Sequence, residues 1–271
     1  AIFFRQANVL GHANVLFVGI GEPGREALRV AGCIAYGALE NHKVTSAAIF
    51  GDTVCKVLKV PGSATQSLAE GILLAAYEFT EHKSKGKKDD KKDKKPTLDS
   101  ITVVTTGAPA AADVKALAKA ETLAECQNFA RYLGDQPGNY MTPTMLADAT
   151  VKAAKGTKLK VTVWDKARIK KENMGGLIAV NRGSTEEPRF IIMEYNGGGK
   201  GQKPIVFVGK GLTFDTGGIS IKPSAQMEEM KYDMCGGAAV IGTMLALAKL
   251  KAKVNAIGLV PSTDNMPGPD S

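Results

Sequence analysis

The amino-acid sequence predicts two α/β layer domains, with mixed sheets flanked by helices. Short apolar runs alternate with segments of helical periodicity in both halves of the chain. Between the halves, residues 111–133 are rich in alanine and contain no glycine or proline, which predicts a long helix. Residues 134–143 then break regular structure with two prolines and two glycines. We therefore expect an N-terminal domain over residues 1–110, a linking helix over 111–133 and a second domain over 134–271.

The first half contains three expected strands and two expected helices. Residues 14–20 form a short apolar strand, and a helix follows over 23–40 because Pro23 suits the first helical turn. Residues 44–50 predict a second strand, and 67–79 carry apolar residues at helical spacing. Residues 101–105 are β-branched and predict a third strand.

The second half repeats the alternation of strands and helices. A segment rich in small residues, 235–250, predicts a buried helix. The remaining segments are short and apolar or alternating, and we expect all of them to be strands. They are residues 158–164, 177–180, 189–195, 205–209 and 254–260.

Composition and charge exclude several classes of protein. No apolar run approaches the ~20 residues needed to cross a bilayer, so no membrane partner is expected. Four scattered cysteines without a CxxC pair indicate reduced thiols and a cytoplasmic location. Residues 83–95 hold eight lysines and three aspartates, which accounts for most of the net charge of +8. That segment has no aromatic residue to stack on bases, so it predicts a solvated loop and argues against a nucleic-acid partner.

The densest group of chemically useful residues follows the expected strand at 205–209. Lys210, Asp215, Lys222 and Asp233 are interspersed with glycines, and loops at strand ends commonly hold the sites of α/β proteins. Two aspartates supply the hard oxygen ligands that divalent metals prefer. A charged surface turn with weak Lys–Asp ion pairs is the alternative, and spacing does not decide between them.

These residues stand in segments that resemble the M17 leucyl aminopeptidase family, also called cytosol aminopeptidases. The resemblance covers most of the chain and is strongest between Lys210 and Pro267. Further upstream, it includes residues 130–143 and 69–79. The segments that carry it are 208–218 (VGKGLTFDTGG), 219–223 (ISIKP), 230–234 (MKYDM) and 264–267 (DNMP).

The resemblance implies a role for each residue. Lys210, Asp215 and Asp233 match metal ligands, and Asp233 is also expected at the substrate. Lys222 matches the catalytic lysine beside the substrate carbonyl, and Met230 matches a residue lining the pocket for the first side chain. Met230 also lies at helical spacing from neighbouring methionines, so a role in the core is the alternative.

The implied cofactors are two divalent ions, zinc or manganese and possibly magnesium. An amine binds a metal only in its neutral form, and an adjacent dication favours loss of its proton. Two ions roughly 3.5–4 Å apart can activate water and polarise a peptide carbonyl. A protonated Lys222 would stabilise the resulting oxyanion. The implied activity is the removal of N-terminal, leucine-like residues from peptides by a homohexamer.

The chain departs from the family pattern at its ends. The family continues to an Asn-Thr-Asp-Ala-Glu-Gly-Arg segment with further ligands, and the present chain ends at Ser271 without it. We expect an incomplete catalytic domain, an N-terminal domain whose start is incomplete, and little or no activity from this chain alone. Asp264 stands where the family usually has glutamate, a substitution that we expect to be tolerated.

Two other functions remain as alternatives. Gly19-x-Gly21-x-x-Gly24 follows an expected strand and opens an expected helix, as a dinucleotide site in an NAD-dependent oxidoreductase requires. Glu40 and Asp52 are poorly placed for the acidic residue of such a site. A non-enzymatic scaffold is the second alternative, and it would need no metal.

Overall fold

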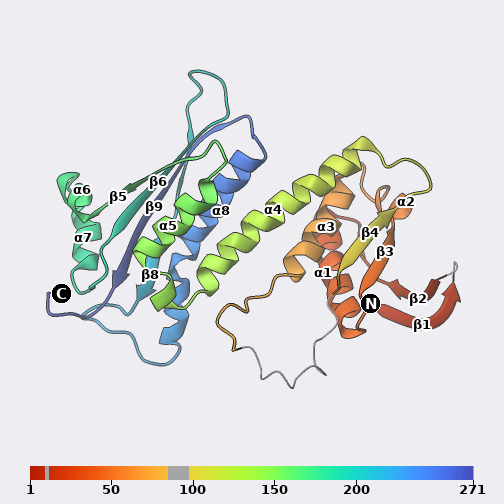
Figure 1. The fold of residues 1–271 in the computed structure, drawn as a ribbon, viewed down its shortest axis with the longest axis horizontal. Helices are drawn as coiled ribbons and strands as arrows, with labels where there is room; N and C mark the ends of the chain where they lie inside the picture. Colours follow the sequence, from red (N-terminus) through yellow and green to blue (C-terminus); the bar gives the residue numbers. More distant parts are fainter. Residues whose placement is uncertain (10–11, 85–97, 271) are drawn as a thin grey trace. The chain divides into compact units, whose positions relative to one another are not determined.

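The computed structural model describes residues 1–9, 12–84 and 98–270. The described chain forms two compact units, Ala1–Ala124 and Glu125–Ser271, and the boundary between them falls inside helix α4 (Ala111–Asp135) (Figure 1). Each unit combines sheets with flanking helices, which confirms the predicted mixed α/β class. The expected division at residues 110 and 133 stays a prediction.

The first unit contains two small sheets and the helices that follow them. Strands β1 and β2 form an antiparallel hairpin, and β3 and β4 form a parallel pair. The hairpin strand β1 and the short helix α2 were not expected from the sequence, whereas the other strands and helices overlap the predicted segments. The elements are β1 (Ile2–Val9), β2 (His12–Phe17), α1 (Arg25–Asn41), β3 (Ser46–Phe50), α2 (Gly51–Val54), α3 (Ser63–Ala75) and β4 (Ser100–Val104).

Helices α1 and α3 pack at unusually close range because glycines stand at their contact. A Cβ atom on Gly32 of α1 would overlap the carbonyl oxygen of Leu68. A Cβ atom on Gly71 of α3 would overlap the carbonyl oxygen of Arg29. The Arg29 guanidinium lies 2.9 Å from the Glu70 carboxylate beside this contact. The hydrogen bond to Glu70 is the main reason that the pKa of Arg29 is raised above its ordinary value.

The second unit is built on a five-stranded mixed sheet. Its order is β5-β6-β9-β7, and β8 pairs with a further part of β9. Strands β5, β6 and β9 are antiparallel neighbours, whereas β7 and β8 run parallel to β9. The strands are β5 (Lys160–Trp164), β6 (Arg189–Asn196), β7 (Ile205–Val208), β8 (Gly211–Asp215) and β9 (Asn255–Asn265).

Helices cover both faces of this sheet (Figure 1). Helices α5 and α8 lie on one side and α6 and α7 on the other, with the short turns η1 and η2 in the connections. The elements are η1 (Gly138–Tyr140), α5 (Pro143–Ala154), α6 (Lys166–Lys171), α7 (Gly175–Asn181), η2 (Met227–Met234) and α8 (Cys235–Lys249).

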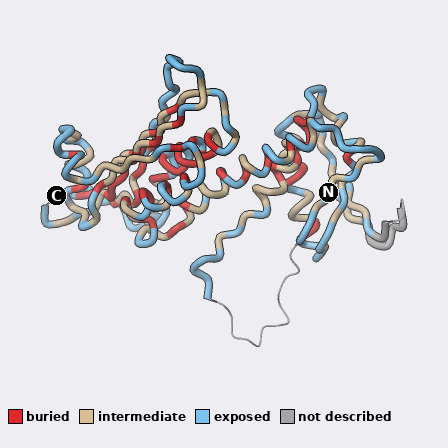
Figure 2. The backbone as a smooth tube through the Cα atoms, turned by 45° about the horizontal axis from the view of Figure 1, so that its top comes forward, coloured by how far each residue is buried: buried red, intermediate tan, exposed pale blue. Residues whose placement is uncertain are grey.

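The core of the second unit lies where the sheet meets α8. Ile191 and Met193 of β6 pack with Ile241 and Met244 of α8, and all four are fully buried. Figure 2 shows buried positions gathered along α8 and the strands beside it. The predicted helix at 235–250 is confirmed by α8, whose small residues allow it to approach the sheet closely.

One expectation for the second unit is wrong for an identifiable reason. Residues 177–180 were expected to form a strand but lie in α7, because a four-residue apolar run fits a helix as well as a strand. The break predicted over residues 134–143 is confirmed, because α4 ends at Asp135 and Pro143 opens α5, a helix that was not expected. The Thr142 side chain caps that helix by accepting a hydrogen bond from the Met145 N–H.

Within the described residues, no helix is long and apolar enough to cross a membrane. The four cysteines Cys33, Cys55, Cys126 and Cys235 are free. The lysine-rich loop expected at 83–95 lies almost entirely outside the described residues, from residue 85 onward.

The close packing of α1 and α3 gives a testable prediction. The substitution Gly32→Ala should lower the free energy of unfolding by about 1–3 kcal/mol, because the new methyl group meets the Leu68 carbonyl and the helices must separate. Gly37→Ala is the matched control in the same helix, since a Cβ there meets nothing within 4 Å. It should raise stability by up to ~1 kcal/mol through helix propensity. Urea unfolding followed by far-UV circular dichroism measures the free energy of unfolding of both variants. Equal changes in the two variants would contradict the close contact between α1 and α3.

Candidate functional site

The candidate site forms where two successive strands pair with one edge of β9. Strand β7 pairs with Ala256–Leu259 and β8 pairs with residues 262–265 further along. Gly209 and Lys210 occupy the break between β7 and β8. This arrangement places Lys210 at the start of β8 and Asp215 at its end.

The N-terminus of α8 fixes the backbone at the break. The Gly237 N–H donates a 2.7 Å hydrogen bond to the carbonyl oxygen of Lys210. A Cβ on Gly209 would overlap the carbonyl oxygen of Gly236, so no larger residue fits at that position. The glycines at this point of the sequence are therefore explained by close approach of a helix end to a strand. Asp233 stands immediately before the same helix.

Lys210 and Asp233 form the first of two ion pairs. The Lys210 Nζ lies 2.8 Å from Asp233 Oδ2, and the side chains are 58% and 23% exposed. The Asp233 Oδ2 atom is itself buried and accepts no hydrogen bond of acceptable geometry. The short distance and the missing hydrogen bond agree because the Lys210 amine lies within ion-pair distance of Asp233 Oδ2 but at an angle that a hydrogen bond does not allow. The Lys210 ammonium is thus the ion-pair partner of a buried carboxylate oxygen that accepts no hydrogen bond.

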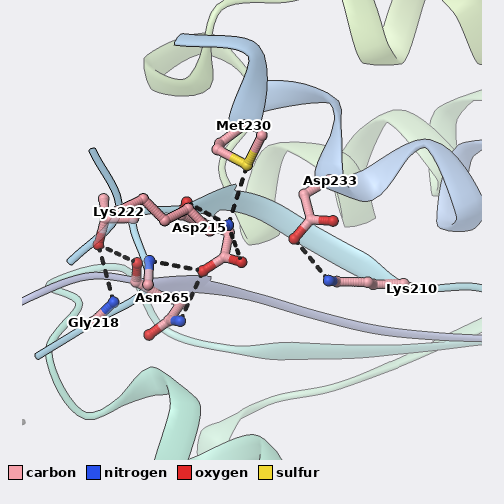
Figure 3. Close-up of polar contacts among 9 residues, drawn as sticks. Lys210, Asp215, Gly218, Lys222, Met230, Asp233 and Asn265 are labelled. Carbon is pink, nitrogen blue, oxygen red and sulfur yellow. Dashed lines mark hydrogen bonds and ion pairs between the residues drawn. The ribbon is translucent and has the colours of Figure 1, made fainter. Parts of the chain in front are cut away.

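Lys222 and Asp215 form the second ion pair (Figure 3). The Lys222 ammonium donates to Asp215 Oδ2 at 2.6 Å, to the Asp215 carbonyl at 3.2 Å and to the Met230 sulfur at 3.1 Å. The turn between the partners needs positive φ values of 90° at Gly217 and 70° at Gly218, which glycine adopts without strain.

The other oxygen of Asp215 is bound by neutral donors. Asp215 Oδ1 accepts hydrogen bonds from the Gly217 N–H at 3.0 Å and from the Asn265 side-chain amide at 2.7 Å. Burial raises the pKa of the Asp215 carboxyl, but the hydrogen bonds from Lys222, Gly217 and Asn265 together hold it below its ordinary value. Asp215 is therefore an anion with a fixed orientation.

The structure brings the predicted residues to one region as two ion pairs. Strand β8 packs against η2, which carries Met230 and Asp233, and Figure 3 shows both pairs in this region. Among the described residues, no group of three or more His, Cys, Asp or Glu side chains could hold a metal. A metal here would thus need the Lys210 amine besides Asp215 and Asp233. The ligand roles, and the roles of Lys222 and Met230, stay predictions.

Sequence reasoning gave no role to Asn265, which contacts Asp215 directly. Asn265 lies in the 264–267 segment on which the family resemblance was based. Its pairing with Asp215 arises because the two residues are register partners at the ends of β8 and β9. Fifty positions separate them in the chain, so no local spacing could have indicated the contact.

The glycine-rich turn at residues 19–24 lacks the surroundings of a dinucleotide site. Within the described chain, β2 pairs with β1 in an antiparallel hairpin, rather than with β3 in a parallel β-α-β unit. A Cβ on Gly19 or Gly24 would meet nothing within 4 Å, so close packing does not require glycine at either position. The arrangement does not favour the oxidoreductase alternative.

Comparison with known families agrees with the site. The catalytic-domain model of the cytosol aminopeptidase family matches residues 128–271. The N-terminal-domain model of that family matches residues 3–86. The chain belongs to the cytosol aminopeptidase family, M17. The resemblance inferred from the sequence is thereby confirmed.

Individual M17 relatives and structures are similar over nearly the whole chain. A probable cytosol aminopeptidase of Bdellovibrio bacteriovorus is 51% identical over 269 residues, which is 98% of this chain and 52% of the relative. A second, from Chlorobaculum tepidum, is 38% identical over 99% of this chain and 55% of its own. The chain therefore spans about half the length of these curated relatives.

Two solved structures share the fold. The bottromycin maturation enzyme BotP in complex with Mn is 29% identical with a TM-score of 0.82, covering 100% of this chain and 55% of BotP. A mutant of tomato leucine aminopeptidase is 26% identical with a TM-score of 0.73. The match covers 90% of this chain and 46% of the tomato chain.

Asp264 of this M17 chain lies in a separate buried group. It is 6% exposed, and its carboxylate accepts hydrogen bonds from the hydroxyls of Thr213 and Ser184. Burial raises the pKa of the Asp264 carboxyl above its ordinary value, because the two hydroxyl bonds only partly offset the loss of water. The folded chain thus favours the protonated form of Asp264.

The raised pKa of Asp264 gives a prediction for stability against pH. Its stabilising contribution is fully present below the unfolded value of about 3.9 and is lost as pH rises through the higher folded pKa. Asp264→Asn removes this titration and keeps an oxygen for Thr213. The variant should therefore gain stability relative to the wild type as pH rises from about 4 to 7. Urea unfolding over this range measures the difference, and parallel pH curves would contradict it.

Proposed function

We propose that this chain is part of a metal-dependent aminopeptidase that removes the first residue of peptides, with a preference for leucine-like side chains. The observation that carries the proposal is the gathering of the Lys210 amine with the Asp215 and Asp233 carboxylates around β8 and η2. The names of the curated relatives support an aminopeptidase working in the cytosol. A homohexamer of the whole protein belongs to the same proposal.

The donor set fits a divalent cation. Asp215 and Asp233 offer hard oxygen ligands, and one of them, Asp233 Oδ2, is buried without a hydrogen bond. The Lys210 Nζ lies 2.8 Å from this oxygen, so an ion bound there would also meet the amine. We propose zinc or manganese, or magnesium, and two ions in the complete enzyme. Such ions, when bound, polarise the scissile carbonyl and activate water.

Lys222 is proposed to stabilise negative charge on the substrate. Its ammonium group now donates to the Asp215 carboxylate and to the Met230 sulfur. Asp215 would hold the cation, and the Lys222 ammonium, no longer paired with that carboxylate, would be free to turn toward the site. The freed N–H groups can then donate to the carbonyl oxygen as it gains charge, which is where stabilisation accelerates hydrolysis most.

Met230 is proposed to line the pocket for the first side chain of the peptide. Its thioether lies 3.1 Å from the Lys222 Nζ, so it borders the position where the scissile carbonyl would be held. A flexible, polarisable side chain at this point suits bulky apolar groups such as leucine.

This chain alone is proposed to have little or no peptidase activity. Three side chains from one region are few for two ions, and the chain spans about half the length of its relatives. A non-enzymatic scaffold is the alternative, and its distinguishing property is that it needs no metal.

The ligand role of Lys210 can be separated from its ion-pair role. Lys210→Arg keeps the positive charge beside Asp233 but cannot offer a neutral amine. The variant should fold normally and bind Mn²⁺ at least about ten-fold more weakly than the wild-type chain, as should Asp233→Ala. Asp148→Ala, an exposed aspartate on α5, is the matched control and should bind as the wild type does. Isothermal titration calorimetry measures the affinities, and no Mn²⁺ binding by the wild type would support the scaffold instead.

The activity of the chain itself is a separate prediction. The purified 271-residue chain with Mn²⁺ should hydrolyse leucine p-nitroanilide no faster than Mn²⁺ alone, because the three proposed ligands are too few to hold two ions. Release of nitroaniline is followed by absorbance. A clear rate that Asp233→Ala abolishes would contradict the prediction of inactivity while supporting the proposed metal site.

A further inference from the structure

Three features, the last two of which belong to the same backbone pairing, hold Asn265 beside Asp215. The first is the 2.7 Å hydrogen bond from the Asn265 amide nitrogen to Asp215 Oδ1. The second is the register of the sheet, in which Asp215 and Asn265 are partners. The third is the backbone: the Asn265 carbonyl accepts bonds from the Thr216 N–H at 2.9 Å and the Thr216 hydroxyl at 2.8 Å. The amide donor is thus fixed relative to the carboxylate.

The far side of the Asn265 amide is also confined. A Cβ placed on Gly218 would lie 2.8 Å from the Asn265 Oδ1 atom, closer than real Cβ contacts allow. Gly218 is buried and has a φ of 70°. The amide is therefore bounded by the carboxylate on one side and by a glycine turn on the other.

The chemistry of the three Asp215 donors separates them into two kinds. Lys222 is a cation on Oδ2 and would compete with a metal ion for the same negative charge. Asn265 and the Gly217 N–H are neutral donors on Oδ1, and they leave the full carboxylate charge available. When the ammonium group leaves, the neutral donors still fix the carboxylate. Outer groups that orient metal-binding carboxylates in this way raise metal affinity.

We propose that Asn265 is a positioning residue, whose amide keeps the Asp215 carboxylate turned toward the site so that it can bind a divalent cation. The proposal rests on the proposed metal-dependent function. It assigns to β9 a direct part in the site, although β9 supplies no ligand among the residues proposed here.

The test compares two asparagines of the same strand. Asn265→Ala removes the donor to Asp215. Asn255→Ala is the matched control, because its amide bonds only loop backbone, accepting from Gly198 at 2.9 Å and donating to Gln202 at 2.9 Å. Calorimetric titration with Mn²⁺ gives the dissociation constants of the 271-residue chain, and the visible spectrum with saturating Co²⁺ reports the geometry of the ligands.

Asn265→Ala should bind Mn²⁺ about 10–100-fold more weakly than the wild type and change the Co²⁺ spectrum. Asn255→Ala should change neither. If Asn265→Ala does not fold, Gly218→Ala carries the test, because it displaces the amide without removing it and should weaken Mn²⁺ binding similarly. Gly156→Ala, with a φ of 77° and open space around its Cβ, controls for backbone strain.

The outcomes separate the two proposals. Wild-type affinity and spectrum in Asn265→Ala, with binding lost in Asp233→Ala, would overturn the role of Asn265 and leave the metal site standing. Equal weakening in Asn265→Ala and Asn255→Ala would also overturn it, because the loss would then be structural. Absence of Mn²⁺ binding by the wild-type chain would overturn both proposals.

Discussion

The site depends on one strand, β9, that pairs with two successive strands along the same edge. The break between β7 and β8 exposes Lys210, and the parallel register of β8 with β9 brings Asp215 beside Asn265. The N-terminus of α8 closes on this break through glycines and places Asp233 next to the Lys210 amine. The backbone position of each proposed ligand therefore follows from strand pairing and helix packing. Only the amine and carboxylate groups at the ends of the side chains depend on side-chain rotation.

The two Lys–Asp pairs are consistent with a site that exchanges its own cations for metal ions. Exposed ion pairs contribute only about 0–1 kcal/mol, because solvent screens them and long side chains lose freedom. Lys210 is 58% exposed and Lys222 35%, so water can solvate either ammonium group when it separates, whereas the Asp233 and Asp215 side chains are only 23% and 14% exposed and need another cation in its place. A dication offers the same two carboxylates a stronger partner. In the proposed site, the Lys222 ammonium would be the counterion that a dication replaces, while the Lys210 amine and the Asn265 amide would stay in place.

Much of this arrangement could be predicted from the sequence, because its signals were local or belonged to a long family pattern. The position of Pro23 and local composition located α1, α4 and α8 within a few residues, and Lys210, Asp215, Lys222 and Asp233 were found from one continuous segment. What was missed depends on distant partners or on ambiguous local signals. Strand β8 is defined by its pairing with β9, and Pro143, which belongs to the predicted break, is also the first residue of α5. Asn265 acquires its contact only when β8 and β9 lie side by side.

The central claim is that Lys210, Asp215 and Asp233 can share a cation. Crystals of the 271-residue chain grown with Mn²⁺, with data recorded near the manganese absorption edge, test it most directly. The account predicts an anomalous peak within bonding distance of Lys210 Nζ and of both carboxylates, with the Lys222 ammonium moved away from Asp215. Intact ion pairs at both positions in saturating Mn²⁺, with no peak between them, would contradict it.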